Sequence, residues 1–67
     1  MTKYRVKKID TRKANTIEDY NILISNAPII YCNGIKELET YCGGKLHKQR
    51  CGYSGIIANF EYIAEKC

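Results

Sequence analysis

Residues 42–52 read CGGKLHKQRCG, and the predicted fold depends on this stretch. It places Cys42, His47 and Cys51 on one short segment, and a glycine follows each of the two cysteines. Glycine permits backbone conformations in which N–H groups turn toward a thiolate. Cysteine sulfur and histidine nitrogen are the usual ligands of structural zinc. We therefore expect this stretch to supply three ligands of a structural zinc site.

The two remaining cysteines determine how that site would be completed. Zinc takes four ligands at tetrahedral corners with Zn–S near ~2.3 Å, which brings the sulfur atoms within about 4 Å of one another. If residues 34–42 are helical, a rise of ~1.5 Å per residue separates Cys32 from Cys42 by roughly 13–15 Å. An all-cysteine site with Cys32 in place of His47 is the alternative, and it requires a shorter helix. The predicted ligand set is Cys42, His47, Cys51 and Cys67.

The length of the chain explains why a metal is expected. With 67 residues we predict a single domain over 1–67, and a core of that size is marginal without a disulfide, a metal or a partner. The N-terminus is charged, with no apolar run of signal-peptide or membrane-spanning length behind it. We therefore expect a cytoplasmic protein whose thiols bind metal. If the chain is instead a fragment of a secreted protein, the alternative is that its four cysteines form two disulfides and bind no metal.

Two segments before the cysteine-rich stretch predict strands. In residues 3–9, Tyr4 and Val6 alternate with Arg5 and Lys7, with Lys8 out of phase, which indicates a half-buried strand with one basic face. Residues 28–32 are β-branched and aromatic, which is typical of a buried strand. The polar residues 10–15 read as a connection after the first strand, and residues 45–51 are expected to be extended and basic.

Helices are predicted over 16–25 and over 34–42. Asn15 with Glu18 three residues later matches a helix-start pattern for the first helix. Apolar residues recur at helical spacing in the second, and Gly43 is suited to its left-handed cap.

The tail over 54–67 fits two periodicities. A helix would bury Ile56, Ile57, Phe60, Ile63 and Ala64, whereas a strand would bury Ile56, Ala58, Phe60 and Tyr62. The Ala, Glu and Lys content favours the helix. The whole pattern predicts an α+β fold with a short antiparallel sheet, two or three short helices and one structural zinc.

The charge of the chain suggests what it binds. The net charge is +4, and most of the basic residues fall into two groups, over 3–13 and over 45–50. A basic surface suits nucleic acid or an acidic protein patch, and tyrosine suits protein interfaces and base stacking alike. The predicted partner-binding residues are Lys3, Arg5, Lys7, Lys45, Lys48, Arg50 and Tyr53.

The motifs of catalysis are not found in the sequence. It contains neither the H-E-x-x-H of zinc proteases nor the H-x-E and P-C-x-x-C of deaminases. Gly43-Gly44-Lys45 resembles the end of a phosphate-binding loop, but Leu46 stands where Ser or Thr would hold magnesium. A short domain also has little room for a substrate cleft, so we expect no enzyme activity and no catalytic residues.

The size, the Ile/Lys/Asn/Tyr-rich composition and the Cys42…His47…Cys51 loop resemble those of small phage-encoded anti-CRISPR inhibitors, some of which contain metal. The resemblance implies a protein that docks on a CRISPR effector nuclease in the host cytoplasm and blocks DNA loading or cleavage. The positive charge argues against DNA mimicry, which needs an acidic surface. The alternative is a zinc-stabilised nucleic-acid-binding module in which strand 3–8 and loop 45–50 hold phosphates.

Overall fold

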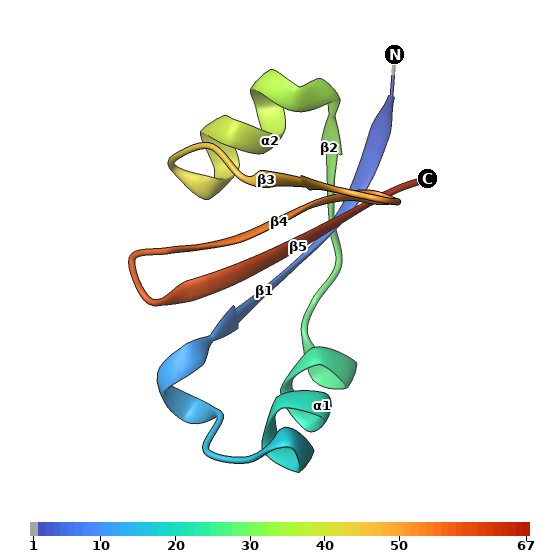
Figure 1. The fold of residues 1–67 in the computed structure, drawn as a ribbon. Coiled ribbons are helices and arrows are strands. Elements are labelled where there is room, and N and C mark those ends of the chain that lie inside the picture. Colours follow the sequence, from blue (N-terminus) through green and yellow to red (C-terminus); the bar gives the residue numbers. More distant parts are fainter. Residues whose placement is uncertain (1) are drawn as a thin grey trace.

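The computed structural model describes residues 2–67, and it folds them into five strands and two α-helices (Figure 1). This confirms the predicted α+β class with an antiparallel sheet. The elements in chain order are β1 (Lys3–Asp10), a short 3-10 helix (Thr11–Lys13), α1 (Ile17–Asn26), β2 (Ile30–Asn33), α2 (Gly34–Cys42), β3 (His47–Gln49), β4 (Gly52–Ile57) and β5 (Phe60–Lys66).

The strands form one sheet in the order β2-β1-β5-β4-β3, with every neighbouring pair antiparallel. The first strand of the chain therefore lies beside the last, near the middle of the sheet (Figure 1). Tyr4 of β1 is paired with Cys32 on one side and with Lys66 on the other. The two edges of the sheet are β2 and β3, and they have very different sequences.

One face of the sheet, here called the α2 face, carries the hydrophobic core. Side chains alternate along a strand, so Tyr4 and Val6 share this face, where α2 covers them with Leu38 and Cys42. Two tyrosine pairs complete the packing edge to face, Tyr4 with Tyr53 and Tyr41 with Tyr62, each at 5.8 Å between ring centroids. The buried members of the core are Tyr4, Val6, Cys32, Leu38, Cys42, Tyr62 and Ala64.

The opposite face, here called the α1 face, is covered only in part. α1 has no buried residue, and Lys7 of β1 holds its C-terminal end by donating from Nζ to the carbonyl oxygen of Ile24 at 3.1 Å. The N-cap of α1 is Thr16, whose hydroxyl accepts from the backbone N–H of Asp19 at 3.1 Å. The predicted N-cap, Asn15, was wrong by one residue, because it is the Thr16 hydroxyl that reaches this N–H.

The prediction of a helix over the tail was wrong. Ala58 and Asn59 adopt positive φ angles of 51° and 68°, and this tight turn joins β4 to β5 as a hairpin. β5 then pairs with β4 on one side and β1 on the other. Pairing on both edges satisfies its backbone groups, and it outweighs the small helix propensity of Ala, Glu and Lys.

The predicted strand over 28–32 forms, but it is not buried throughout. Only Cys32 is buried among the residues of β2, while Ile30 and Tyr31 are exposed. The reason is topological, because β2 is an edge strand and has a neighbour on one side only.

Candidate interaction surface

The four predicted zinc ligands lie in different environments. Cys42, the last residue of α2, is buried, whereas Cys51 in the β3–β4 turn and Cys67 at the end of the chain are exposed. His47 is exposed on the edge strand β3. Within residues 2–67, no three His, Cys, Asp or Glu side chains lie together in a group able to hold a metal ion. As arranged, these residues do not fit a zinc site, and zinc stays a prediction from the sequence.

Cys32, the alternative ligand, is a member of the core and is 2% exposed. Burial, followed by the nearby Glu37 carboxylate, raises the pKa of the Cys32 thiol. Burial also raises the pKa of Cys42 to about 11, and the neighbouring Cys32 adds to the effect. Thiols are poor ligands and poor nucleophiles until they ionise, so these two cysteines act as small apolar core residues.

Cys51, directly before β4, and Cys67, directly after β5, lie at the same end of the sheet. Lys66 donates its backbone N–H to the carbonyl oxygen of Cys51 at 2.9 Å, and Cys67 donates its own to Lys3 at 2.9 Å. Cys51 is therefore opposite Lys66, one residue before Cys67. Alternation along the strand directs the two cysteine side chains to opposite faces, which is unfavourable for a disulfide between them.

The two groups of predicted partner-binding cations do not form one patch. Lys3, Arg5 and Lys7 lie on β1, whereas Lys48 lies on β3 at the far edge of the sheet. β5 and β4 separate these strands, which puts them about 14 Å apart at the usual ~4.8 Å strand spacing. Lys45 and Arg50 flank β3 and are exposed with it. The sequence therefore identified two separate basic surfaces.

The β1 cations share the α1 face, and each has a neighbour within the chain. The Lys3 ammonium lies 5.3 Å from the centre of the Tyr31 ring. The Arg5 guanidinium is 3.8 Å from the Glu65 carboxylate, and Lys7 is bonded to the Ile24 carbonyl of α1. Of these three cations, Lys3 is the one whose charged group has no oxygen partner within residues 2–67.

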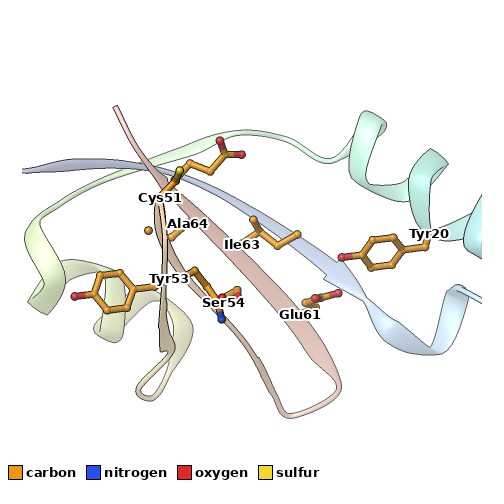
Figure 2. Close-up of a pocket in the computed structure, with 10 residues that line it drawn as sticks. Tyr20, Cys51, Tyr53, Ser54, Glu61, Ile63 and Ala64 are labelled. Atoms are coloured by element: carbon orange, nitrogen blue, oxygen red, sulfur yellow. The ribbon is translucent and has the colours of Figure 1, made fainter.

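Beside α1, the α1 face is hollowed by a cavity of about 270 Å³ (Figure 2). The Tyr20 ring projects from α1 toward Ile63 and Glu61. Partial burial, together with the Glu61 carboxylate, raises the pKa of the Tyr20 phenol. A smaller hollow of about 120 Å³ lies beside Arg5 and Lys7 and shares Ile63 with the first. These hollows make the α1 face uneven and suited to contact with another molecule.

Tyr53 was predicted to be exposed, and this was wrong, while its role in partner binding stays a prediction. It is half-buried and packs against Tyr4 on the α2 face, and its ring points away from Tyr20 in Figure 2. The aromatic side chain available for contact is Tyr31, which is 53% exposed.

The sequence analysis did not predict that apolar residues of β2, and Ile29 directly before it, would be exposed. Ile29 is 48% exposed, Ile30 38% and Tyr31 53%, and we call these three residues the β2 strip. Large exposed apolar groups that gather in one place mark interaction sites more often than scattered ones do. The signal in the sequence was the short length of the segment after Pro28, which is typical of an edge strand.

The candidate site is therefore the β2 strip with the neighbouring cations Lys3 and Arg5. None of the helices in residues 2–67 has the length and apolarity needed to cross a membrane. Comparison with known protein families, with curated proteins and with solved structures finds no match to this chain.

Proposed function

We propose that this protein is a non-enzymatic binding protein that acts by covering a surface of a larger macromolecule. The observation that carries the proposal is the β2 strip, an uncharged apolar segment exposed at the edge of the sheet. Aromatic residues and arginine are enriched in protein interfaces, and Tyr31 and Arg5 are directly paired across β2 and β1. These features favour a protein partner.

The resemblance to small anti-CRISPR inhibitors supplies the first partner to test, a CRISPR effector nuclease. The basic residues next to the strip favour docking on an acidic patch of such a partner, because opposite charges speed association and fix its orientation. Inhibition would then follow from steric blocking of DNA loading or cleavage, with no chemistry supplied by this chain.

The test is to titrate the chain into a guide-loaded effector nuclease and to measure DNA binding and DNA cleavage separately. The variant Ile30→Asp with Tyr31→Asp places two charges in the strip. Ile56→Asp is the matched control, since Ile56 is 65% exposed but lies on β4 inside the sheet. We expect inhibition by the native chain and by the control, and at least a tenfold loss in the strip variant. Absence of a complex, or equal inhibition by all three chains, would contradict the proposal.

The second candidate function is nucleic-acid binding, which is favoured by the row of Lys3, Arg5 and Lys7 on one face of β1. Binding to phosphates weakens with salt by about one logarithmic unit per contact. Because Arg5 and Lys7 already have neighbours in the chain, we expect a slope near one or below. A slope near three, abolished by charge reversal of the row, would favour nucleic acid over a protein partner.

A further inference from the structure

We propose that the free edge of β2 accepts an extended segment of a partner protein, in which acidic and apolar residues alternate, as an additional strand of the sheet. This inference rests on the proposed function, and it specifies the kind of partner segment that would bind at the β2 edge. Three observations carry it: the direction of the backbone groups of β2, the contrast between the two sheet edges, and the charge next to the strip.

The backbone of Tyr31 faces outward. Gly34 donates its N–H to the carbonyl oxygen of Thr2 at 2.7 Å, which extends the β1–β2 register in which Tyr4 is opposite Cys32. In an antiparallel pair, hydrogen-bonded and non-bonded positions alternate. Even-numbered residues of β2 therefore bond to β1, and the N–H and C=O of Tyr31 point away from it. Since β2 ends the sheet, these groups are available to another strand.

The opposite edge is protected and this one is not. Proteins prevent unwanted pairing by placing short, charged strands at their edges, with lysine the most common protection. β3 fits that description, because its three residues are His47, Lys48 and Gln49 and all are exposed. Residues 27–35, which contain β2, carry no charged side chain. Strand addition is therefore expected at β2.

The charge beside β2 indicates what kind of strand would bind. Lys3 and Arg5 lie on the α1 face of the neighbouring strand, and the Lys3 ammonium extends over the Tyr31 ring toward the edge. An added strand would bring its alternate side chains to that face, where carboxylates are favoured. Its other side chains would lie on the α2 face beside Ile30, where apolar groups are favoured.

The same charges disfavour a second copy of this chain as the occupant. Each copy carries a net charge of +4, and pairing of two β2 strands would bring two sets of Lys3 and Arg5 near each other. Like charges at close range cost free energy, and this cost is smallest when salt screens it. An acidic strand gains from the same field.

The test uses the full chain labelled with ¹⁵N and a capped synthetic hexapeptide of alternating glutamate and valine. We expect amide shifts concentrated at Tyr31 and Asn33, and slower hydrogen exchange of the Tyr31 N–H. A hexapeptide of alternating lysine and valine is the control for charge and is expected not to bind. Shifts centred on β3 or on the cavity beside Tyr20 would overturn the inference, as would equal binding of both peptides.

Two variants separate the charge from the backbone contribution. Lys3→Glu is expected to weaken binding of the acidic peptide about tenfold, while Lys48→Glu makes the same charge change at the opposite edge and is expected to leave it unchanged. Tyr31→Pro removes the outward N–H, which β1 does not use, and should abolish binding. Hydrogen exchange of the β1–β2 amides in Tyr31→Pro shows whether β2 has remained in place. If it has not, the comparison of Lys3→Glu with Lys48→Glu tests the inference instead.

The remaining outcomes also distinguish the alternatives. Dimerisation without peptide, with the Tyr31 amide protected, would identify a second copy as the occupant and overturn the inference. Peptide binding at β2 without inhibition of a nuclease would leave strand addition standing and contradict the nuclease as partner. Nuclease inhibition that survives both Lys3→Glu and Tyr31→Pro would support the proposed function and overturn strand addition.

Discussion

The two faces of the sheet are built from the same strands but are packed very differently. On the α2 face, Val6 and Leu38 have no measurable exposure. On the α1 face, the covering helix buries no residue, and its Ile17 and Ile22 are 80% and 58% exposed. Alternation along β1 separates Tyr4 and Val6 on one side from Lys3, Arg5 and Lys7 on the other. Lys8 departs from this division, because it lies on the side of Tyr4 and Val6, over the Phe60 ring.

This difference separates stability from binding. Burying a large apolar side chain contributes about 1.5–3 kcal/mol, so most of the free energy of folding comes from the α2 face. The α1 face and the β2 edge bury fewer apolar side chains, and the proposed binding depends on them. Substitutions on the two faces can test this division, beginning with the largest expected effect.

Truncation of the core should have the greatest effect. Leu38→Ala removes a fully buried side chain, and we expect it to lower the free energy of unfolding by about 2–5 kcal/mol. The matched change on the other face, Ile22→Ala, should cost about 0.5 kcal/mol or less because that side chain is exposed. Chemical denaturation measures both. Comparable losses would mean that α1 contributes as much to stability as α2.

Addition of one methyl group at Gly52 should have the next largest effect. A Cβ at this position would overlap the backbone carbonyl oxygen of Ala64, so β4 would have to move away from β5. We expect a loss of about 1–3 kcal/mol. Gly44→Ala is the control, since its Cβ would meet only the flexible end of Ile57, at 3.1 Å. Equal denaturation midpoints for the two variants would refute the expected tight approach of β4 to β5.

Loss of the α1 cap should have a smaller effect. Thr16→Ala removes the hydroxyl that accepts the Asp19 N–H, which typically costs about 1 kcal/mol. Thr40→Ala in α2 is the control, because its hydroxyl bonds to the Lys36 carbonyl inside the helix, where such bonds add little stability. Circular dichroism and denaturation compare them. A larger loss at Thr40 would contradict the view that α1 depends on local contacts.

Thiol labelling should leave the fold unchanged and still distinguish the two environments. At pH 8 we expect a thiol reagent to modify the exposed Cys51 and Cys67, while the buried Cys32 and Cys42 react only on unfolding. Mass spectrometry of the native chain measures the number of labels. Rapid reaction of all four thiols would show that the core opens readily.

The raised pKa of Cys42 adds a pH dependence to this prediction. An unfolded thiol ionises near the reference value of 9.0, while the folded one stays protonated until about 11. The folded state then binds more protons, so the stability that is present below pH 9 should fall as the pH rises from 9 to 11. Cys42→Ala should reduce this fall. The measurement is the free energy of unfolding at each pH, compared for each chain with its own value at pH 8.

The local elements could be predicted because short-range signals specify them. Apolar–basic alternation gave the strand over 3–9 and helical periodicity gave the helices over 16–25 and 34–42. Gly43 takes the left-handed conformation with φ 80° that its position after the helix suggested. The tail was misassigned, because Ala58 and Asn59 are not a strong turn pair and its pairing partner β1 lies about fifty residues earlier.

The candidate site could be predicted only in part. The basic row of Lys3, Arg5 and Lys7 followed from the alternation of β1, but the exposure of Tyr31 and the burial of Tyr53 did not. Both depend on the position of a strand within the sheet, at its edge or in its interior. The expected grouping of Cys42, His47, Cys51 and Cys67 assumed that nearness along the chain means nearness in space.

The sequence by itself determined the class of the fold, the approximate extent of α1 and α2 and the basic face of its first strand. These features depend on contacts and backbone preferences that span a few residues. Only the tertiary structure decided that β5 lies between β1 and β4, that β2 is a free edge, and that Cys32 and Cys42 are buried while Cys51 and Cys67 are exposed. Strand order is set by pairing between distant segments, whose free energy depends on the whole sheet and which no short stretch of sequence specifies.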